Sequence, residues 1–546
     1  MKSYIEEKRI RPDVLTSMLY LSFVIMMVYN VISVRIFGDK GAGYFAGPMA
    51  LYFLFYVSFV LAVQKSVYVM VRLRARRSQF LNAEASMKKS MRLFAIIGII
   101  TTGIFMAASL PIARTLFGSV RSYFQVIIVA ASLIFLCPQG VLRGYLQGLG
   151  YTKPIFICDT LMAVTSSIVG ALVSGIMFSY GKKVNELFHV DEYSAIYGAS
   201  GMMIGLLAGS IVGLIQIGIS MALRKNEIKE IVKAGTPKYL DNKNDVLAGI
   251  KVIALLYASP VIICLLDNIV YVAYYAKNGD ITEAIAMYGA FFGRVITLVA
   301  LFAFLCSMPF IKSWNRVMAR VERDEFEGSR ERLKKLIHFE SLLLIPVCIF
   351  VFTIAQTIQV FLFGKSNPAV NGIIQLSSIM ILLFAIAIFC SWLLNHMGKS
   401  MVILVDLAAG CAVHIILIIV LFLVFKNGLM GIMLSLLGAY LIYDILSIFM
   451  IFKMLKYRQE LVKTFCIPLI CAAVSGLILF VINLIFVNLI GDVLTLLIGI
   501  VVYTIIYMML LIVLRGVKIH ELQRIPLGRL FLGFAEKVQK EAAYEE

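Results

Sequence analysis

The stretch Val493 to Leu514, VLTLLIGIVVYTIIYMMLLIVL, decides the fold of this chain because it runs for 22 residues without a charge. A helix needs about 20 apolar residues to cross a bilayer, and backbone at that depth must satisfy its own hydrogen bonds, which a helix does. Similar stretches fill most of the 546 residues. We therefore predict an all-α polytopic membrane protein with 14 transmembrane helices. The predicted spans are Val14–Val34, Pro48–Val71, Leu93–Ile112, Phe124–Leu142, Ile155–Phe178, Tyr197–Leu223, Val252–Ala276, Ala284–Ile311, Phe339–Phe363, Ile373–His396, Met401–Phe425, Leu429–Phe452, Phe465–Val487 and Val493–Leu514.

Composition and charge agree with this prediction. Hydrophobic residues make up 61% of the chain and charged residues 15%, against about 45–50% and about 25% in soluble domains. Most Lys and Arg lie in the N-terminal tail, the even-to-odd loops and the C-terminal tail. The positive-inside rule then places both termini in the cytoplasm of a protein of the plasma membrane. The net charge of +19 thus follows from the membrane topology, because it comes mainly from basic residues in the cytoplasmic loops and tails. Such basic loops face anionic lipid headgroups, and without a recognition module we expect no nucleic-acid binding.

An internal duplication divides the chain. Leu116-Phe117-Gly118 recurs as Leu362-Phe363-Gly364, and Gly198-Ala-Ser-Gly201 corresponds to Gly428-Leu-Met-Gly431. Spans 1 to 6 therefore repeat as spans 7 to 12, which is typical of transporters built from parallel repeats. We predict two six-helix lobes at residues 1–223 and 252–454, a cytoplasmic linker at 224–251, two extra helices at 464–514 and a cytoplasmic tail at 515–546. In that tail, apolar residues at helical spacing (Leu527, Leu530, Phe531 and Phe534) predict an amphipathic helix on the membrane surface.

Two basic residues lie inside predicted spans, Lys65 in span 2 and Arg294 in span 8. A charge near the bilayer centre costs about 2.5–3.5 kcal/mol on insertion scales, so it usually faces an enclosed wet space and has a partner or a task. Lys65 could instead snorkel towards the interface, and Arg294 could form an ion pair with Asp267 in span 7. If both face the space between the lobes, they form a cationic site for an anion such as a phosphate.

Acidic residues inside the spans are Asp159, Asp267, Asp406 and Asp444. Asp159 and Asp406 lie near helix starts, where a carboxylate favours the helix dipole, so we expect both to cap. Asp267, its neighbour Asn268, and Asp444 lie deeper. They are candidates for binding a coupling proton or cation, or for pairing with Arg294.

Signatures of catalysis are absent from the sequence. There is no P-loop, the five histidines are scattered, and the nine cysteines lie within apolar segments without metal-ligand spacing. We expect a transporter rather than an enzyme, with no cofactor and no metal, acting as a monomer.

Several stretches resemble a known family. They are Phe37-Gly-Asp-Lys-Gly-Ala-Gly-Tyr44, Ala62-Val-Gln-Lys65, Arg143-Gly-Tyr-Leu-Gln-Gly148 with Thr152-Lys-Pro154, Tyr197-Gly-Ala-Ser-Gly201, Arg330-Glu-Arg-Leu-Lys-Lys335 and Ile519-His-Glu-Leu-Gln-Arg-Ile-Pro526. With them the chain resembles the polysaccharide-biosynthesis flippases of the multidrug/oligosaccharidyl-lipid/polysaccharide (MOP) superfamily, in particular the stage V sporulation protein B-like and MviN/MurJ-like members. Arg143-Gly-Tyr-Leu-Gln-Gly148 is the most specific of these motifs.

The resemblance implies two six-helix lobes of the MATE-like fold that alternate between inward and outward openings, with a cationic cavity for a polyprenyl-linked pyrophosphate. Lys65 falls where such families often place a span-2 cation, and Asp267 where an aspartate often follows Leu-Leu in span 7. Span 1 lacks the arginine that lipid II flippases of the MurJ type carry there, which argues against lipid II as the substrate.

We therefore expect a flippase for a lipid-linked oligosaccharide or cell-wall precursor, with membrane lipids and a coupling proton or Na⁺ as further partners. Lys65 and Arg294 would hold the pyrophosphate and Arg143 would guard the cytoplasmic mouth, while Asp267, Asn268 and Asp444 would bind the coupling ion. One alternative is a cation-coupled multidrug exporter of the same fold. Another is a non-transporting scaffold for cell-envelope or spore-wall assembly.

Overall fold

The computed structural model describes residues 12–235, 244–321, 323, 325–523 and 528–544, and every regular element in these ranges is helical. The predicted cytoplasmic N-terminal tail up to residue 11, the middle of the predicted linker at 236–243, and Pro526 and Leu527 of the tail lie outside the described residues. Thirteen helices among those described are long and apolar enough to cross a membrane. The prediction of a polytopic all-α membrane protein is confirmed, and the count of 14 spans stays a prediction.

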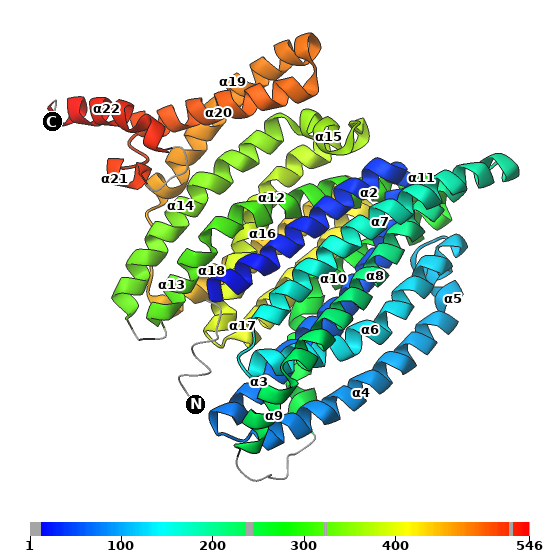
Figure 1. The fold of residues 1–546 in the computed structure, drawn as a ribbon. Helices are drawn as coiled ribbons and strands as arrows, with labels where there is room; N and C mark the ends of the chain where they lie inside the picture. The colour runs from blue at the N-terminus through cyan, green and yellow to red at the C-terminus, as the bar shows by residue number, and fades with distance from the viewer. Residues whose placement is uncertain (1–11, 236–243, 322, 324, 524–527, 545–546) are drawn as a thin grey trace. The chain divides into compact units, whose positions relative to one another are not determined.

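Two compact units make up the chain, residues 1–297 with 398–411, and residues 298–397 with 412–546. The first contains α2 (Pro12–Phe55), the π-helix η1 (Tyr56–Ala62), α3 (Val63–Arg76), α4 (Phe80–Ala107), α5 (Ser109–Leu116), η2 (Val120–Ser122), α6 (Tyr123–Gly148), α7 (Lys153–Phe188), α8 (Tyr193–Leu223), α9 (Lys225–Lys233), α10 (Asn244–Asn278), α11 (Ile281–Ala290) and the π-helix η3 (Phe291–Ile296) (Figure 1). Since α10 and α11 pack on α2, the predicted lobe 252–454 is shared between the units; the internal repeat stays a prediction.

The second unit contains the remaining helices. They are α12 (Thr297–Ser307, from Leu298), η4 (Met308–Phe310), α13 (Ile311–Val321), α14 (Phe326–Thr353), α15 (Ala355–Phe363), α16 (Pro368–His396), the end of α17 (Ser400–Leu417), the π-helix η5 (Ile418–Val424), α18 (Gly428–Leu455), η6 (Val462–Cys466), α19 (Ile467–Ile490), α20 (Asp492–Val513), α21 (Ile519–Leu522), η7 (Gly528–Phe531) and α22 (Leu532–Tyr544).

One helical run joins the first two predicted spans. Residues Thr16–Arg76 form a single candidate helix of 61 residues. At 1.5 Å per residue this run is about 90 Å long, enough to cross a hydrocarbon core of about 30 Å twice. Gly38 interrupts it with φ 71° and ψ −172°, a conformation that is essentially restricted to glycine. The chain thus changes direction at Gly38 without a loop.

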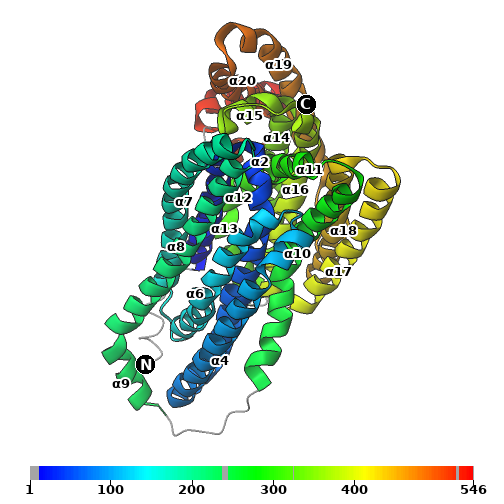
Figure 2. The same cartoon turned by 90° about the vertical axis from the view of Figure 1, so that its right-hand side faces the viewer.

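Glycines allow the most extensive helix pairing in the first unit, that of α7 with α8. On α8, Gly201, Gly205 and Gly209 recur every four residues and so line one face. A Cβ on Gly205 would lie 2.4 Å from the Cα of Gly170 on α7, and one on Gly201 would lie 2.4 Å from the Cα of Ser174. Such small residues let helix backbones touch in a membrane. Figures 1 and 2 show α7 and α8 side by side along their length.

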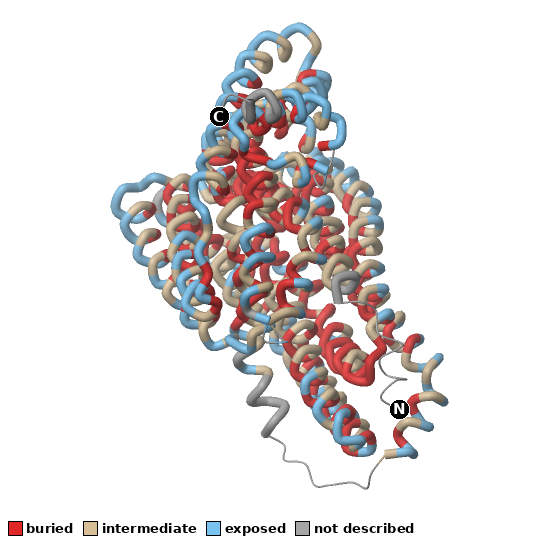
Figure 3. The backbone as a smooth tube through the Cα atoms, turned by 90° about the vertical axis from the view of Figure 1, so that its left-hand side faces the viewer, coloured by how far each residue is buried: buried red, intermediate tan, exposed pale blue. Residues whose placement is uncertain are grey.

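Outward faces of many helices carry exposed apolar side chains. Ile99 on α4 is 64% exposed and Ile176 on α7 is 71% exposed, and Figure 3 shows exposed and buried positions alternating along the helices. Isolated apolar residues on a soluble surface need no explanation, but a whole face of them on a membrane-spanning helix suits contact with lipid.

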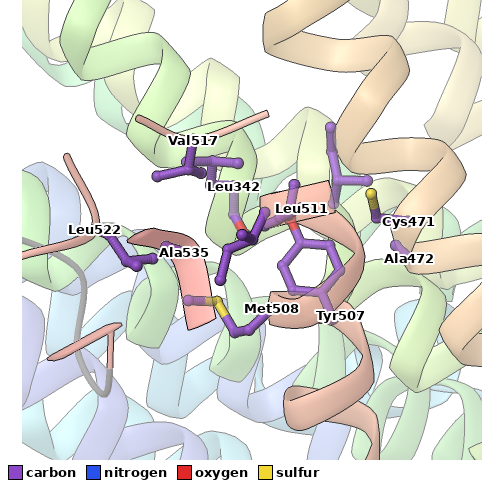
Figure 4. Packing of buried hydrophobic residues seen from close by; sticks show 11 residues of the cluster. Leu342, Cys471, Ala472, Tyr507, Met508, Leu511, Val517, Leu522 and Ala535 are labelled. Carbon is purple, nitrogen blue, oxygen red and sulfur yellow. Dashed lines mark hydrogen bonds between the residues drawn. The ribbon is translucent and has the colours of Figure 1, made fainter. Parts of the chain in front are cut away.

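The C-terminal tail packs on the second unit. Leu522 of α21 and Ala535 of α22 are 1% and 0% exposed, and they join a cluster with Leu342 of α14 and Met508 of α20 (Figure 4). The hydroxyl of Tyr507 on α20 donates to the carbonyl of Leu342 at 3.0 Å. Leu530 remains 78% exposed and Phe534 37% exposed. The predicted tail helix is therefore partly a packing element of this unit, and only its outer apolar residues remain available to lipid.

Candidate functional site

Arg294 is held by Asp39 in the first unit. Its Nε donates to Oδ1 of Asp39 at 2.6 Å and its Nη2 donates to Oδ2 at 3.1 Å. The Arg294 side chain is 6% exposed and that of Asp39 is 20% exposed. This two-bond geometry is the strong, planar form of an arginine–carboxylate pair. The structure thus pairs Arg294 with the acid next to the break at Gly38, and the pairing with Asp267 that the sequence suggested stays a prediction.

Close backbone contact brings the pair together. A Cβ on Gly289 of α11 would lie 2.0 Å from the carbonyl oxygen of Asp39, and one on Gly43 of α2 would lie 1.9 Å from the carbonyl oxygen of Ile285. Glycine at both positions therefore lets α2 and α11 touch. Arg294 itself lies on the π-helix η3, and π-turns inside helices often occur at functional sites.

Lys65 lies farther along the same helical run as Asp39. It is the third residue of α3, and its Nζ lies 5.8 Å from the centre of the Tyr68 ring. Among the described residues it forms no ion pair. Lys65 follows Asp39 by 26 residues in one helical run, or about 39 Å of helix, and Figure 1 shows α3 and α11 at opposite ends of this unit.

The expectation that Lys65 and Arg294 hold one pyrophosphate is therefore not met in this structure. Arg294 lies beside Asp39, and a pyrophosphate that spans a few ångströms cannot also reach Lys65. The two cations therefore lie at separate positions within one unit.

Arg143 is fully buried and forms an ion pair inside the helix bundle. It lies on α6 with 0% exposure, and its Nη2 is 2.5 Å from Oδ1 of Asp159 on α7. The hydroxyl of Tyr56, on the π-helix η1, donates to the same oxygen at 3.2 Å. The expected role of Arg143 at an open mouth is not supported by this position, because its charge is already neutralised inside the helix bundle.

Asp159 and Asp406 do not cap their helices. Each is the seventh residue of its helix, Asp159 in α7 and Asp406 in α17. The helix dipole acts within the first turn, so the capping expectation is wrong for both. Asp159 also lines a small pocket of about 40 Å³ with Tyr52 and Ser166. Such a space holds a few water molecules and is far smaller than the several hundred Å³ of a ligand pocket.

The deeper acids differ in their surroundings. Asp267 and Asn268 on α10 are 1% and 3% exposed, and Oδ1 of Asn268 has no hydrogen-bond partner among the described residues. It lies close to α2, since a Cβ on Gly47 would be 3.1 Å from it. Asp444 on α18, in the second unit, is 3% exposed, and within the described ranges neither of its carboxylate oxygens has a hydrogen-bond partner.

Asp39 is the site residue that the sequence analysis missed. Its stretch, Phe37 to Tyr44, reads as a polar loop between two spans, so Asp39 was not counted among the acids in the membrane. The signal was present in the same stretch, because an acid between glycines that allow close helix contact is well placed to meet a cation from a neighbouring span.

Comparisons with known proteins agree with this architecture. The chain is 22% identical over 522 residues to the stage V sporulation protein B of Bacillus subtilis (strain 168), covering 92% of this chain and 95% of the relative. No family model matches the chain.

Among solved structures, the chain resembles the inward-facing form of a multidrug resistance MATE-family transporter of the MOP superfamily, with a TM-score of 0.58 and 12% identity over 81% of this chain and 99% of the other. It also resembles the inward closed form of the lipid II flippase MurJ, with a TM-score of 0.57 and 16% identity over 91% and 98%. The chain therefore has the fold of the MATE and MurJ transporters of the MOP superfamily, as its sequence motifs predicted.

Proposed function

We propose that this protein is a flippase that carries a polyprenyl-(pyro)phosphate-linked oligosaccharide or cell-wall precursor across the plasma membrane by alternating access. The observation that carries the proposal is Lys65, a cation within a membrane-spanning run that has an aromatic neighbour but no ion pair among the described residues. An anionic headgroup cannot cross hydrocarbon unaided. A fixed cation in an enclosed wet space lowers that barrier while the lipid tail remains in the bilayer.

Two separate anion sites, Lys65 and Arg294, fit a carrier better than a single site does. Lys65 is available for an anion in this structure, whereas Arg294 is engaged by Asp39. With both termini in the cytoplasm, α3 is at the cytoplasmic end of its span and the Asp39–Arg294 pair is at the outer end. The headgroup would meet Lys65 first and would reach Arg294 once the Asp39–Arg294 pair has opened. Arg143 acts in this account by holding α6 to α7 through Asp159.

Relatives support the choice of substrate class. MurJ is a lipid II flippase, but the chain lacks an arginine in its first span, so we propose a lipid-linked saccharide other than lipid II. A proton or Na⁺ bound at Asp267, Asn268 or Asp444 would couple the cycle to an ion gradient, and the protein would act as a monomer. The MATE likeness favours a second candidate, a cation-coupled multidrug exporter, because fold alone does not decide between the substrates.

Reconstitution tests the proposal. Purified protein in liposomes that contain a fluorescent polyprenyl-pyrophosphate saccharide should expose the saccharide in the second leaflet, and both Lys65→Gln and Arg294→Ala should lose this flux. Lys182→Gln is the matched control, because Lys182 also contacts an aromatic ring, at 5.0 Å from that of Phe178, but lies on an exposed part of α7. Unchanged flux in Lys65→Gln, or export of a lipophilic cation instead of the saccharide, contradicts the proposal.

A further inference from the structure

We propose that Asp444 on α18 is a proton-binding site, which holds a neutral carboxylic acid in this conformation and releases one proton when the second unit rearranges. The coupling of this proton to transport rests on the function proposed above, whereas proton binding itself does not. The proposal narrows the choice between a proton and Na⁺ to the proton and assigns it to a single side chain.

The Asp444 carboxyl is buried and has no hydrogen-bond partner among the described residues. Asp444 is 3% exposed, lies 16 residues after Gly428 and 11 residues before Leu455 in α18, and has no hydrogen-bond partner at either oxygen within the described part of the chain. Asp39 and Asp159 are also largely buried, yet each pairs with an arginine. A buried carboxylate without such a partner takes up a proton rather than remain charged.

In the described part of the chain, no basic side chain reaches hydrogen-bond distance of the Asp444 carboxyl. The helices that pack most extensively on α18 are α16 and the π-helix η5, and Val413 and Leu417 of α17 also face α18 at Gly438. The titratable or charged residues of α16, η5 and α18 other than Asp444 are Cys390, His396, Tyr440, Tyr443 and Lys453, and the part of α17 in the second unit adds His414. Lys453 is nine residues away, or about 13 Å along the helix, and His396 is at the exposed end of α16. No second acid occurs on α16, η5 or α18.

Metal-ion binding fits this environment poorly. A hard cation needs several oxygen ligands around it, and Asp444 is the one carboxylate on α16, η5 and α18. A proton needs only one carboxylate oxygen. Protonation converts the carboxylate and one H⁺ from water into the acid, and release returns the carboxylate and the H⁺ to water, so no other reactant is consumed.

Hydroxyl groups near Asp444 in the sequence link α18 to α16, and a proton that leaves Asp444 has to be passed to them, since neither carboxylate oxygen is bonded to them among the described residues. The hydroxyl of Tyr443 lies 2.6 Å from that of Ser391 on α16, and Tyr443 also shares a hydrogen bond with Ser447. Ser447 is three residues from Asp444, hence on the adjoining face of the helix. These three hydroxyls connect the region of Asp444 to the end of α16 that carries Trp392 and His396.

Infrared spectroscopy of the purified protein without substrate tests proton binding. The spectrum of wild type minus that of Asp444→Asn at neutral pH should show one carboxylic-acid carbonyl band. The same difference for Asp191→Asn, which removes an exposed carboxylate, should show a carboxylate band instead. Asp444→Asn should fold normally, because the amide has the shape of the neutral acid, and Asp444→Glu is a second variant that should restore the acid band. A carboxylate band for Asp444 overturns the proposal.

Transport separates this proposal from the proposed function. In proteoliposomes, a pH gradient should accelerate saccharide flipping by wild type and by Asp191→Asn, while Asp444→Asn should flip at a rate independent of the gradient. An acid band with no saccharide flux in wild type refutes the flippase and leaves the proton site standing. Flux that responds to the pH gradient equally in wild type and Asp444→Asn refutes the coupling role of Asp444.

Discussion

Arg294 and Asp39 meet through two parallel hydrogen bonds, of 2.6 and 3.1 Å, between a π-turn and the residue that follows the break at Gly38. The pair therefore joins two helices at a point where neither has regular α-helical geometry. Because the Arg294 charge is engaged and Lys65 has no ion pair among the described residues, this conformation offers Lys65 to an incoming anion. Arg294 becomes available only when its contact with Asp39 opens.

Asp39→Asn should destabilise the fold because it removes the counter-charge that Asp39 supplies to a nearly buried guanidinium. Breaking a buried pair from one side costs about 3–5 kcal/mol, and the 20% exposure of Asp39 places this loss at the lower end. The double variant Asp39→Asn with Arg294→Gln should be more stable than the sum of the single losses predicts. Equilibrium unfolding of the four proteins measures this coupling, and strictly additive losses would show that the pair does not hold α2 to η3.

Gly289→Ala should destabilise the first unit, since the new Cβ would lie 2.0 Å from the carbonyl oxygen of Asp39. Overpacking of this kind costs about 1–3 kcal/mol. Gly103→Ala on α4 is the matched control, because nothing lies within 4 Å of its Cβ position, and it should stabilise by about 0.5–1 kcal/mol. Melting temperatures of the two variants should move in opposite directions. Equal shifts would show that α2 and α11 do not touch here.

Gly38→Asn tests the turn between the first two spans. With φ 71° and ψ −172°, Gly38 lies outside the left-handed helical region that asparagine tolerates, so the substitution should cost about 1–3 kcal/mol. Gly364, with φ 79° and ψ −20° at the end of α15, lies near that region, and Gly364→Asn should cost much less. Thermal unfolding compares the two, and a harmless Gly38→Asn would contradict the observed backbone.

Asp159→Asn should be among the most destabilising changes in the first unit. It leaves the fully buried Arg143 unpaired, at a cost of about 3–5 kcal/mol. Tyr56→Phe removes only the 3.2 Å hydrogen bond to Asp159 and should cost about 1 kcal/mol. Urea unfolding in detergent ranks the two variants. A larger loss for Tyr56→Phe would mean that the ion pair does not hold α6 to α7.

The helices could be predicted from the sequence where apolar length alone determines them. The predicted spans Phe465–Val487 and Val493–Leu514 agree within a few residues with α19 (Ile467–Ile490) and α20 (Asp492–Val513). The bilayer needs about 20 apolar residues whatever their identity, so hydropathy is sufficient for this part of the fold.

Pairing between helices could not be predicted in this way. Lys65 and Arg294 were recognised as important because a charge in a membrane is costly, but that cost does not say which residue meets which. Asp39 was missed because it follows a glycine and resembles a loop residue. The role of Asp159 was mistaken because the start of α7 lies six residues earlier, at Lys153, and the ion pair with Arg143 depends on how α6 and α7 are placed.

Thermal stabilisation of the purified protein by a short polyprenyl pyrophosphate tests the central claim most directly. Wild type and Lys182→Gln should be stabilised to the same extent, at tenfold ligand excess over Kd by about 1.4 kcal/mol, and Lys65→Gln should not be stabilised. A lipophilic cation should stabilise none of the three. Stabilisation of Lys65→Gln equal to that of wild type, or stabilisation by the lipophilic cation alone, would contradict a flippase in which Lys65 is the first site to bind the anionic headgroup.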